Sequence, residues 1–470
     1  MIAFLVTAFY AAGIIAAIDA VMTVRTSQGA IAWSVSLVSF PFVAVPAYLV
    51  LGRSKFQGQM QAFALRQGEI RNVLETYRSA LRPFEIEPEA APSWHHAVRQ
   101  LSEHEVVSGN QVELLVNGDQ TFESILQGIA AAERYILFQF YMIHDDALGN
   151  RVQKALIERA RAGVQVVVLY DEIGSKGLSD SYIQRFRDAG IAVSSFKPNQ
   201  GWQNRFQLNF RNHRKIVVVD GKVAWIGGHN VGDEYLGLDA EYSPWRDTHV
   251  RLEGPAALQA QLTVMGDWYW ASREELEVNW TPHVVAGANQ HVLVLPTSPV
   301  SKQETASLLF VAALNAAKER IWLTAPYFVP DDAVLKSLQL AAMRGVDVRI
   351  ITSGKGDSLP VWLAAFYYIN QLRDTGIRFY AYQPGFLHQK VMLVDDDVAS
   401  VGTHNFDNRS FRLNFEVMAA VFDKKFASEV ETMLLADFDH ASIIDPRDFE
   451  QKPFFWWLGV RLSYLAAPVL

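Results

Sequence analysis

The sequence predicts an α/β protein in which one strand-and-helix unit occurs twice, preceded by a helical hairpin that crosses a membrane. Three observations support this fold class. They are two long uncharged apolar runs at the N-terminus, a strand and helix pattern that recurs later in the chain, and two copies of one histidine and lysine motif. The 470 residues are enough for about three structural units.

The composition argues against several classes of function. With 42 Lys+Arg against 50 Asp+Glu, the net charge is −8, so the chain lacks the basic excess that is typical of nucleic-acid-binding proteins. There is no cysteine, which excludes disulfides, thiolate metal sites and cysteine nucleophiles. Half of the residues are hydrophobic, and we expect part of that apolar surface to contact lipid.

Residues 1–52 are predicted to form a transmembrane helical hairpin. There is no charged side chain from Met1 to Ile18, and Gly29 to Leu51 form a second uncharged run. A spanning helix needs about 20 apolar residues, and both runs fit that length. A helical hairpin buried in a soluble protein is the alternative. Asp19 either ends the first helix at the membrane interface or has a function within the membrane.

The basic residues near these runs predict a multi-pass protein whose remaining chain faces the cytoplasm. Only Arg25 lies in the loop between the runs, and no basic residue precedes it, whereas four follow the second run: Arg53, Lys55, Arg66 and Arg71. Cytoplasmic flanks carry the excess of lysine and arginine.

Residues 53–108 are predicted to form an amphipathic connector. Apolar residues recur there at helical spacing, at Phe63, Leu65, Ile70, Val73, Leu74 and Tyr77. Prolines then interrupt the helical pattern, at Pro83, Pro88 and Pro92. The connector histidines, His95, His96 and His104, are expected to be solvated rather than to bind metal.

The rest of the chain reads as two copies of one unit, at 109–285 and 286–448. Glu133-Arg134-Tyr135-Ile136 opens an apolar strand pattern in the first copy, and Glu319-Arg320-Ile321-Trp322 opens one in the second. Glycines recur after matching helices in both copies, at Gly163 and Gly190 and at Gly345 and Gly376. Each copy therefore alternates strands and helices, which predicts sheets covered by helices.

Each copy carries the same set of polar residues. The first has His213, Lys215 and Asp220 followed by Asn230, and the second has His388, Lys390 and Asp395 followed by Asn405. Residues i and i+2 of a strand share a face, so each histidine projects beside its lysine. Each aspartate lies where a hairpin turns, so a bracing role and direct participation in catalysis are both open for Asp220 and Asp395.

The paired motifs suit chemistry on a phosphodiester. Such a substrate needs neutralisation of its charge, a nucleophile, and an acid for the departing alkoxide. Two histidines and two lysines meet these needs without a metal or another cofactor. One imidazole attacks phosphorus and the other handles the proton, while the lysines and the two asparagines hold the non-bridging oxygens.

The doubled His-x-Lys-x4-Asp signature resembles the phospholipase D superfamily. The closest resemblance within it is to bacterial cardiolipin synthases, and it covers essentially the whole chain. It is carried by the N-terminal hairpin, by Ala325-Pro326-Tyr327-Phe328-Val329-Pro330, by Arg409-Ser410-Phe411-Arg412-Leu413-Asn414-Phe415-Glu416, and by the C-terminal residues from Arg461 to Leu470.

The resemblance implies a duplicated phospholipase D-type α/β sandwich around a shared active site. It implies transfer of a phosphatidyl group between two phosphatidylglycerol molecules, giving cardiolipin and glycerol through a phosphohistidine. It also implies location in the bacterial inner membrane. His213 would be the nucleophile and His388 the acid, and Asp247 and Glu416 would orient them. A homodimer is possible.

Several alternatives stay open at this point. The enzyme could be a phospholipase D that uses water, or a transferase that uses phosphatidylethanolamine or another alcohol. A nuclease is disfavoured by the net charge, and a scaffold with degenerate motifs by the two intact motifs. His229 and His404 have either a packing role or a substrate contact. Residues 449–470 are predicted to form an interfacial segment on the bilayer, with a core helix as the alternative.

Overall fold

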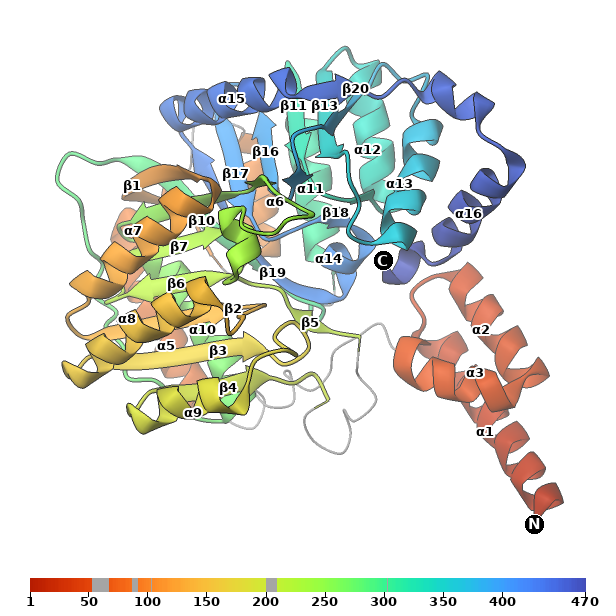
Figure 1. The fold of residues 1–470 in the computed structure, drawn as a ribbon, viewed down its shortest axis with the longest axis horizontal. Helices are drawn as coiled ribbons and strands as arrows, with labels where there is room; N and C mark the ends of the chain where they lie inside the picture. The colour runs from red at the N-terminus through yellow and green to blue at the C-terminus, as the bar shows by residue number, and fades with distance from the viewer. Residues whose placement is uncertain (53–66, 87–91, 103, 200–208, 302) are drawn as a thin grey trace.

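The two predicted copies are joined into a single 16-stranded sheet in the computed structural model of the chain (Figure 1). The structure describes residues 1–470 except 53–66, 87–91, 103, 200–208 and 302. The first half contributes β1 (Val107–Val116), β2 (Tyr135–Phe140), β3 (Gln165–Asp171), β4 (Ala192–Phe196), β6 (Ile216–Val219), β7 (Val223–Gly227) and β9 (Thr248–Glu253). The second half contributes β10 (Gln290–Thr297), β11 (Arg320–Thr324), β13 (Asp347–Ser353), β14 (Arg378–Tyr382), β16 (Val391–Val394), β17 (Val398–Gly402), β19 (Asn414–Phe422) and β20 (Ala441–Ile443). The sixteenth strand, β5 (Arg211–Asn212) of the first half, pairs with β19 at the side of this row.

The strand order is nearly a mirror image about the centre of this sheet. It runs β4-β3-β2-β6-β7-β9-β1 in the first half and β14-β13-β11-β16-β17-β19-β10 in the second, with β20 at the outer edge. The halves meet where β1 pairs antiparallel with β10. The expectation of a duplicated α/β fold is thus confirmed.

The strand and helix alternation forms the outer part of each half. Strands β2, β3 and β4 are parallel to one another, as are β11, β13 and β14, so each connection passes through a helix. Helices α8 (Ala147–Arg161) and α12 (Asp332–Met343) are followed by Gly163 and Gly345, which have φ of +92° and +90°. This left-handed conformation favours glycine and turns each chain into the next strand.

Helices cover the sheet on both faces and enclose three main cores. The outer core of the first half lies beneath α7 (Asn117–Ala131), α8 and α9 (Asp180–Asp188), and that of the second half beneath α11 (Thr305–Ala316), α12 and α13 (Leu359–Gln371). The third core is shared by both halves, because α10 (Ala257–Ser272) and α15 (Lys424–Asp439) pack there against strands of each. This shared core fixes the two halves relative to each other.

The N-terminal segment differs in part from the predicted hairpin. Helix α1 (Ile2–Thr23) is long and apolar enough to cross a membrane, and it is the one helix in the described ranges that meets this criterion. The second run is divided into α2 (Ser27–Ser39), α3 (Pro41–Ala47) and a π-helical turn, Tyr48–Gly52. The break falls at Phe40, before a proline that has no amide hydrogen to continue α2. The prediction of two continuous spanning helices is therefore corrected.

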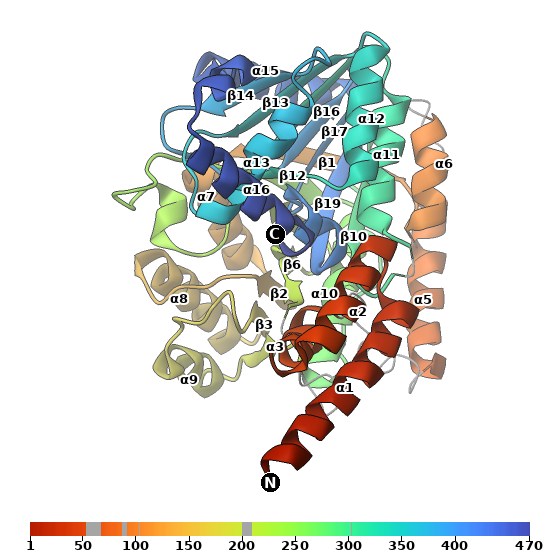
Figure 2. The same cartoon turned by 90° about the vertical axis from the view of Figure 1, so that its right-hand side faces the viewer.

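Helices α1 and α2 nevertheless pack closely as a pair beside the body (Figure 2). A Cβ atom on Gly13 would lie 2.4 Å from the carbonyl oxygen of Leu37, so only glycine permits this approach. Asp19 accepts a hydrogen bond of 2.7 Å from the hydroxyl of Tyr48, which gives that carboxylate a polar partner among apolar residues. Arg25 pairs with Glu304 at 3.0 Å and links the hairpin to the second half.

The connector forms α5 (Gln67–Leu81), a short 3-10 helix, Arg82–Phe84, and α6 (Pro92–Leu101). Tyr77 and Leu81 of α5 are buried in the shared core, as an amphipathic helix requires. Phe63, Leu65, Arg66 and Pro88 lie outside the described residues. His96 is exposed, but His95 and His104 are buried, which corrects the expectation that all three connector histidines are solvated.

Acidification is expected to destabilise the protein through His104. Burial lowers the pKa of His104 to about 4, below the value of about 6.5 in an unfolded chain, so the unfolded state takes up the proton first. As the pH falls from about 6.5 to 4, this histidine lowers the free energy of unfolding by up to about 1.4 kcal/mol per pH unit. The free energy of unfolding is measured with denaturant at pH 7, 6 and 5. It should fall less steeply with decreasing pH in His104→Gln than in the wild type. Equal slopes would contradict this.

Candidate active site

Short strands that cross between the halves position the two motif histidines. His213 follows β5 (Arg211–Asn212), which pairs with β19 of the second half, and its amide donates to the carbonyl oxygen of Phe415 at 2.9 Å. His388 follows β15 (Phe386–Leu387), which pairs with β8 (Trp245–Arg246) of the first half. Its amide donates to the carbonyl oxygen of Arg246 at 2.8 Å. Each histidine is therefore held by backbone from the opposite half.

A carboxylate from the opposite half also binds the ring of each histidine. The Nδ1–H of His213 donates to Glu416 at 2.9 Å, and that of His388 donates to Asp247 at 2.7 Å. All four side chains are buried. With Nδ1 bound in this way, each neutral ring presents its Nε2 lone pair to the cavity. The sequence indicated both carboxylates as orienting residues, but it did not indicate that each one binds the histidine of the opposite half.

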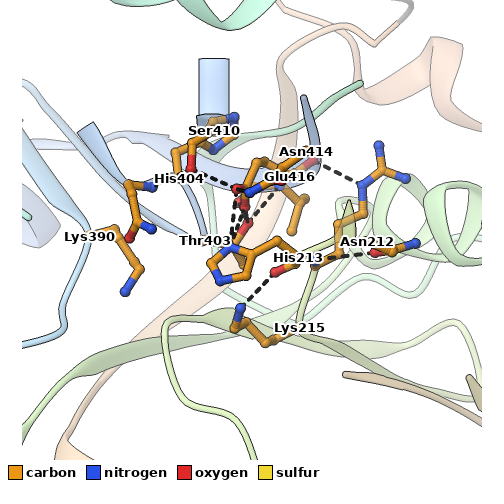
Figure 3. A network of polar contacts seen from close by, with 12 residues as sticks. Asn212, His213, Lys215, Lys390, Thr403, His404, Ser410, Asn414 and Glu416 are labelled. Carbon is orange, nitrogen blue, oxygen red and sulfur yellow. Dashed lines mark hydrogen bonds and ion pairs between the residues drawn. The ribbon is translucent and has the colours of Figure 1, made fainter. Parts of the chain in front are cut away.

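Glu416 lies at the centre of a network of donors (Figure 3). Thr403 donates to it at 2.6 Å, Ser410 at 2.8 Å and Asn414 at 3.0 Å. Burial alone would raise the pKa of Glu416, but the positive charge of His213 in its protonated form and the hydrogen bond from its ring bring the pKa down to about 2. The carboxylate therefore stays ionised and fixes the orientation of the ring. Sequence reasoning missed Thr403 and Ser410, although both lie in stretches that it had singled out.

Asp247 is fixed by close packing as well as by hydrogen bonding. The amide of Thr248 donates to it at 2.8 Å. A Cβ atom on Gly228 would lie 2.0 Å from its Oδ1, so the glycine after β7 leaves the space that this carboxylate fills.

The two motif lysines are buried beside their histidines. Lys215 donates to the carbonyl oxygen of His213 at 2.7 Å and lies 5.2 Å from the ring centre of Tyr141; Lys390 donates to the carbonyl oxygen of His388. Burial lowers the pKa of Lys390 to about 8 and that of Lys215 well below its ordinary value, and the charge of Lys390 lowers the pKa of Lys215 further. An anion bound between the two ammonium groups would relieve this repulsion.

The two histidines are themselves neutral near pH 7. Burial lowers the pKa of His213 to about 4, and the nearby lysines lower it further while Glu416 opposes them. Burial and the same two lysines hold the pKa of His388 well below its ordinary value. A bound phosphate would change this balance, because its negative charge stabilises an imidazolium.

Both histidines open onto one cavity of about 690 Å³. Asn230 and Asn405 line it too. The side chain of Asn230 is held by the hydroxyl of Tyr235 at 2.7 Å and by the amide of Met142 at 3.1 Å. The buried Oδ1 of Asn405 has no partner among the described residues. The cavity therefore joins the histidines and asparagines of both motifs.

Asp220 and Asp395 lie outside this cavity, in turns at the far ends of their strands. Asp220 accepts from the amides of Glu133, Arg134 and Tyr135 at 2.8–2.9 Å, and Asp395 accepts from the amides of Lys318, Glu319 and Arg320. Each aspartate comes seven positions after its histidine, at the other end of β6 or β16, and that length of extended chain spans about 20 Å. This arrangement favours the bracing role of both aspartates over direct participation in catalysis.

Replacing Asp220 by asparagine is expected to affect stability rather than chemistry. The variant loses one acceptor and the charge that hold three amides at the start of β2, which should lower the free energy of unfolding by about 1–3 kcal/mol. Thermal melting and turnover of the folded variant check this. Unaltered melting together with lost turnover would contradict it.

His229 and His404, each of which comes directly before a motif asparagine, contact other buried polar side chains. His229 Nδ1 is 3.0 Å from Nδ1 of His249, and His404 Nε2 is 2.8 Å from the hydroxyl of Thr297. Both are fully or nearly fully buried, and neither lines the cavity that contains the catalytic candidates. This arrangement favours the packing role over the substrate contact.

One group of residues in the described part of the chain has the spacing to hold a metal ion. It consists of His144, Asp146 and Glu234, of which His144 and Glu234 line the cavity. Asp146 already accepts from the amides of Gly149 and Asp233, at 2.8 and 2.7 Å. The group contains neither motif histidine, and we assign no catalytic step to it.

Comparisons with known proteins identify the family of the chain. The family model "Cardiolipin synthase, PLD-like domain" matches residues 125–246 and 310–438, and "Phospholipase_D-nuclease N-terminal" matches residues 11–53. Cardiolipin synthase A of Pseudomonas fluorescens strain Pf-5 is 45% identical over 99% of this chain and 98% of its own length. Cardiolipin synthase A of Pseudomonas aeruginosa strain LESB58 is 46% identical over 97% of this chain and 94% of its own length.

A solved structure shares the fold. The crystal structure of phosphatidylserine synthase from Haemophilus influenzae Rd KW20 superposes with a TM-score of 0.63 at 13% identity, covering 80% of this chain and all of that one. The fold, the doubled motif and the near full-length relatives agree, and the chain belongs to the cardiolipin synthase family of phospholipase D-like proteins.

Proposed function

We propose that this protein is a cardiolipin synthase, which transfers the phosphatidyl group of one phosphatidylglycerol to the terminal hydroxyl of another and releases glycerol. The observation that carries the proposal is the pair of carboxylate-oriented histidines facing one cavity, in a chain about 45% identical to cardiolipin synthases over its length.

In the first step, Nε2 of one histidine attacks the donor phosphorus. A P–N bond forms, the P–O bond to the glycerol headgroup breaks, and the second histidine gives its proton to the departing oxygen. Lys215, Lys390 and the amides of Asn230 and Asn405 hold the non-bridging oxygens. The donor phosphate supplies the negative charge that favours a protonated second histidine.

In the second step, the hydroxyl of the acceptor lipid gives its proton to that second histidine. Its oxygen attacks phosphorus, a new P–O bond forms, and the P–N bond breaks. The products are cardiolipin and the free nucleophilic histidine. Glu416 and Asp247 act as positioning residues, because each keeps the proton of its histidine on Nδ1 and Nε2 directed at the cavity.

The same proposal places the protein in the bacterial inner membrane, with the catalytic halves on the cytoplasmic side. Helix α1 supplies one span, and the basic flank after residue 52 supports the orientation. Helix α16 (Phe454–Leu465) exposes a row of apolar side chains, which supports an interfacial role for residues 449–470. They are Phe454, Phe455, Leu458, Leu462 and Leu465. A multi-pass topology and homodimerisation stay predictions.

Reconstitution in lipid vesicles tests the proposed reaction. The purified full-length protein is incubated in phosphatidylglycerol vesicles, and lipids and glycerol are quantified by mass spectrometry. Cardiolipin and glycerol in equal amounts are expected. Phosphatidic acid in place of cardiolipin would show that water is the acceptor, and phosphatidylethanolamine added as a second donor tests the alternative substrate. The His213→Ala/His388→Ala double variant is the control.

Removal of divalent metals is expected to leave turnover unchanged, because the proposed steps use only histidine, lysine and asparagine side chains. The vesicle assay after dialysis against a chelator checks this prediction. Strong inhibition that a divalent metal reverses would contradict it.

A further inference from the structure

The two halves around the cavity are related by duplication, but they carry chemically different side chains at three pairs of matching positions. The first pair lies at the fourth position after each motif asparagine. The second pair lies two positions before each motif histidine, and the third lies two positions before each orienting carboxylate. On the side of His213 these positions hold Arg409, Arg211 and Asn414, and on the side of His388 they hold Glu234, Phe386 and Trp245.

The two arginines converge on one corner of the cavity. Arg211 in β5 is in register with Asn414 of β19, and Arg409 belongs to α14 (Asn408–Arg412), which leads directly into that strand. Both arginines line the cavity together with His213 and Asn414. The corner therefore combines two guanidinium groups and an amide next to the reacting centre.

The guanidinium of Arg409 is held firmly in place. It donates to the carbonyl oxygen of Asn209 at 2.7 Å and to the side-chain oxygen of the same residue at 3.0 Å, and to the carbonyl oxygen of Val469 at 3.2 Å. Burial lowers the pKa of Arg409, and the charge of Arg211, which lines the same cavity, lowers it further. Two like charges at a cavity wall favour a bound anion.

We propose that Arg211 and Arg409 bind the phosphate of the acceptor lipid, separately from the phosphate that reacts. The inference rests on the proposed function, in which two phosphodiesters must enter the same cavity. The acceptor hydroxyl lies three carbons from the phosphate of its own lipid. Because the proposed reaction uses Lys215 and Lys390 for the reacting phosphate, that second phosphate needs cations of its own.

This subsite would select the acceptor. Water and free glycerol carry no phosphate and gain nothing from the arginines, whereas phosphatidylglycerol gains charge-assisted hydrogen bonds to both. The matching region of the other half is less suited to a phosphate, because the carboxylate of Glu234, 3.3 Å from His144, would repel it and Phe386 is buried and does not line the cavity. The arginines thus favour transfer to lipid over transfer to small alcohols.

A competition between two acceptors tests the proposal. The full-length protein is placed in phosphatidylglycerol vesicles with isotopically labelled glycerol in the buffer, and cardiolipin and labelled phosphatidylglycerol are measured in the same sample. In Arg211→Gln and Arg409→Gln the ratio of cardiolipin to labelled phosphatidylglycerol should fall at least about tenfold. Arg151→Gln, which removes an exposed positive charge elsewhere, should keep the wild-type ratio.

Each outcome decides between the alternatives. An unchanged ratio in both folded glutamine variants would overturn the subsite while leaving the synthase intact. A wild-type protein that makes phosphatidic acid but no cardiolipin would overturn the proposed function and the subsite with it. Arg409 also donates to the backbone of Val469, so the melting temperature of each variant is compared with that of the wild type. If Arg409→Gln unfolds, the product ratio is measured in Arg211→Gln and in Arg409→Lys instead.

Discussion

Alanine at His213 or at His388 is expected to lower phosphatidyl transfer at least about a thousandfold. One variant lacks the nucleophile and the other lacks the group that moves the proton, so neither can complete both steps. Both side chains border a cavity, and their loss should change the melting temperature little. Initial rates in phosphatidylglycerol vesicles, together with thermal melting, measure both effects.

His96→Ala is the matched control, because it removes an exposed histidine far along the chain from either motif. Turnover within about tenfold of the wild type in either motif variant would reject the mechanism with two histidines. A collapse of the melting temperature in both would mean that the loss of turnover reports folding instead of chemistry.

Neutralising the orienting carboxylates should have the second largest effect. In Glu416→Gln the amide can donate as well as accept, so Nδ1–H of His213 is no longer fixed and Nε2 loses its defined role. We expect turnover to fall by about 10²- to 10⁴-fold, and Asp247→Asn should act in the same way on His388. The rate is measured in vesicles across pH 5 to 9.

Thr403→Val is the comparison for this prediction. It removes one hydrogen bond to Glu416 but keeps the carboxylate, so its loss of turnover should be much smaller than that of Glu416→Gln. Equal losses would show that the whole network, and not the charge beside His213, is what turnover requires. Wild-type turnover in Glu416→Gln would reject the positioning role.

Repetition made much of the site predictable from the sequence. His213 and Lys215 recur as His388 and Lys390 in matching surroundings, and such recurrence in a duplicated fold is a far stronger signal than a single copy. The exchange of carboxylates between halves was not predictable in the same way. It depends on β5 and β15, two-residue strands whose pairing partners lie far away in the sequence.

Features that depend on tertiary packing were harder to predict. Asp220 belongs to the motif, yet only the hairpin turn shows that it faces three backbone amides and not the cavity. The apolar run after residue 29 has the length of a span, but a break at Phe40 divides it. Arg211 and Arg409 have no basic counterparts in the other half, where Phe386 and Glu234 take the matching positions, so recurrence does not mark them as site residues.

The covalent intermediate tests the central claim most directly. The wild-type protein turning over in phosphatidylglycerol vesicles is quenched with base, because a P–N bond is labile in acid, and its peptides are mapped by mass spectrometry. The account predicts a phosphatidyl adduct on the peptide of His213 or on that of His388, and on no other residue. Active enzyme with no adduct on either histidine, or with one on a different side chain, would contradict it.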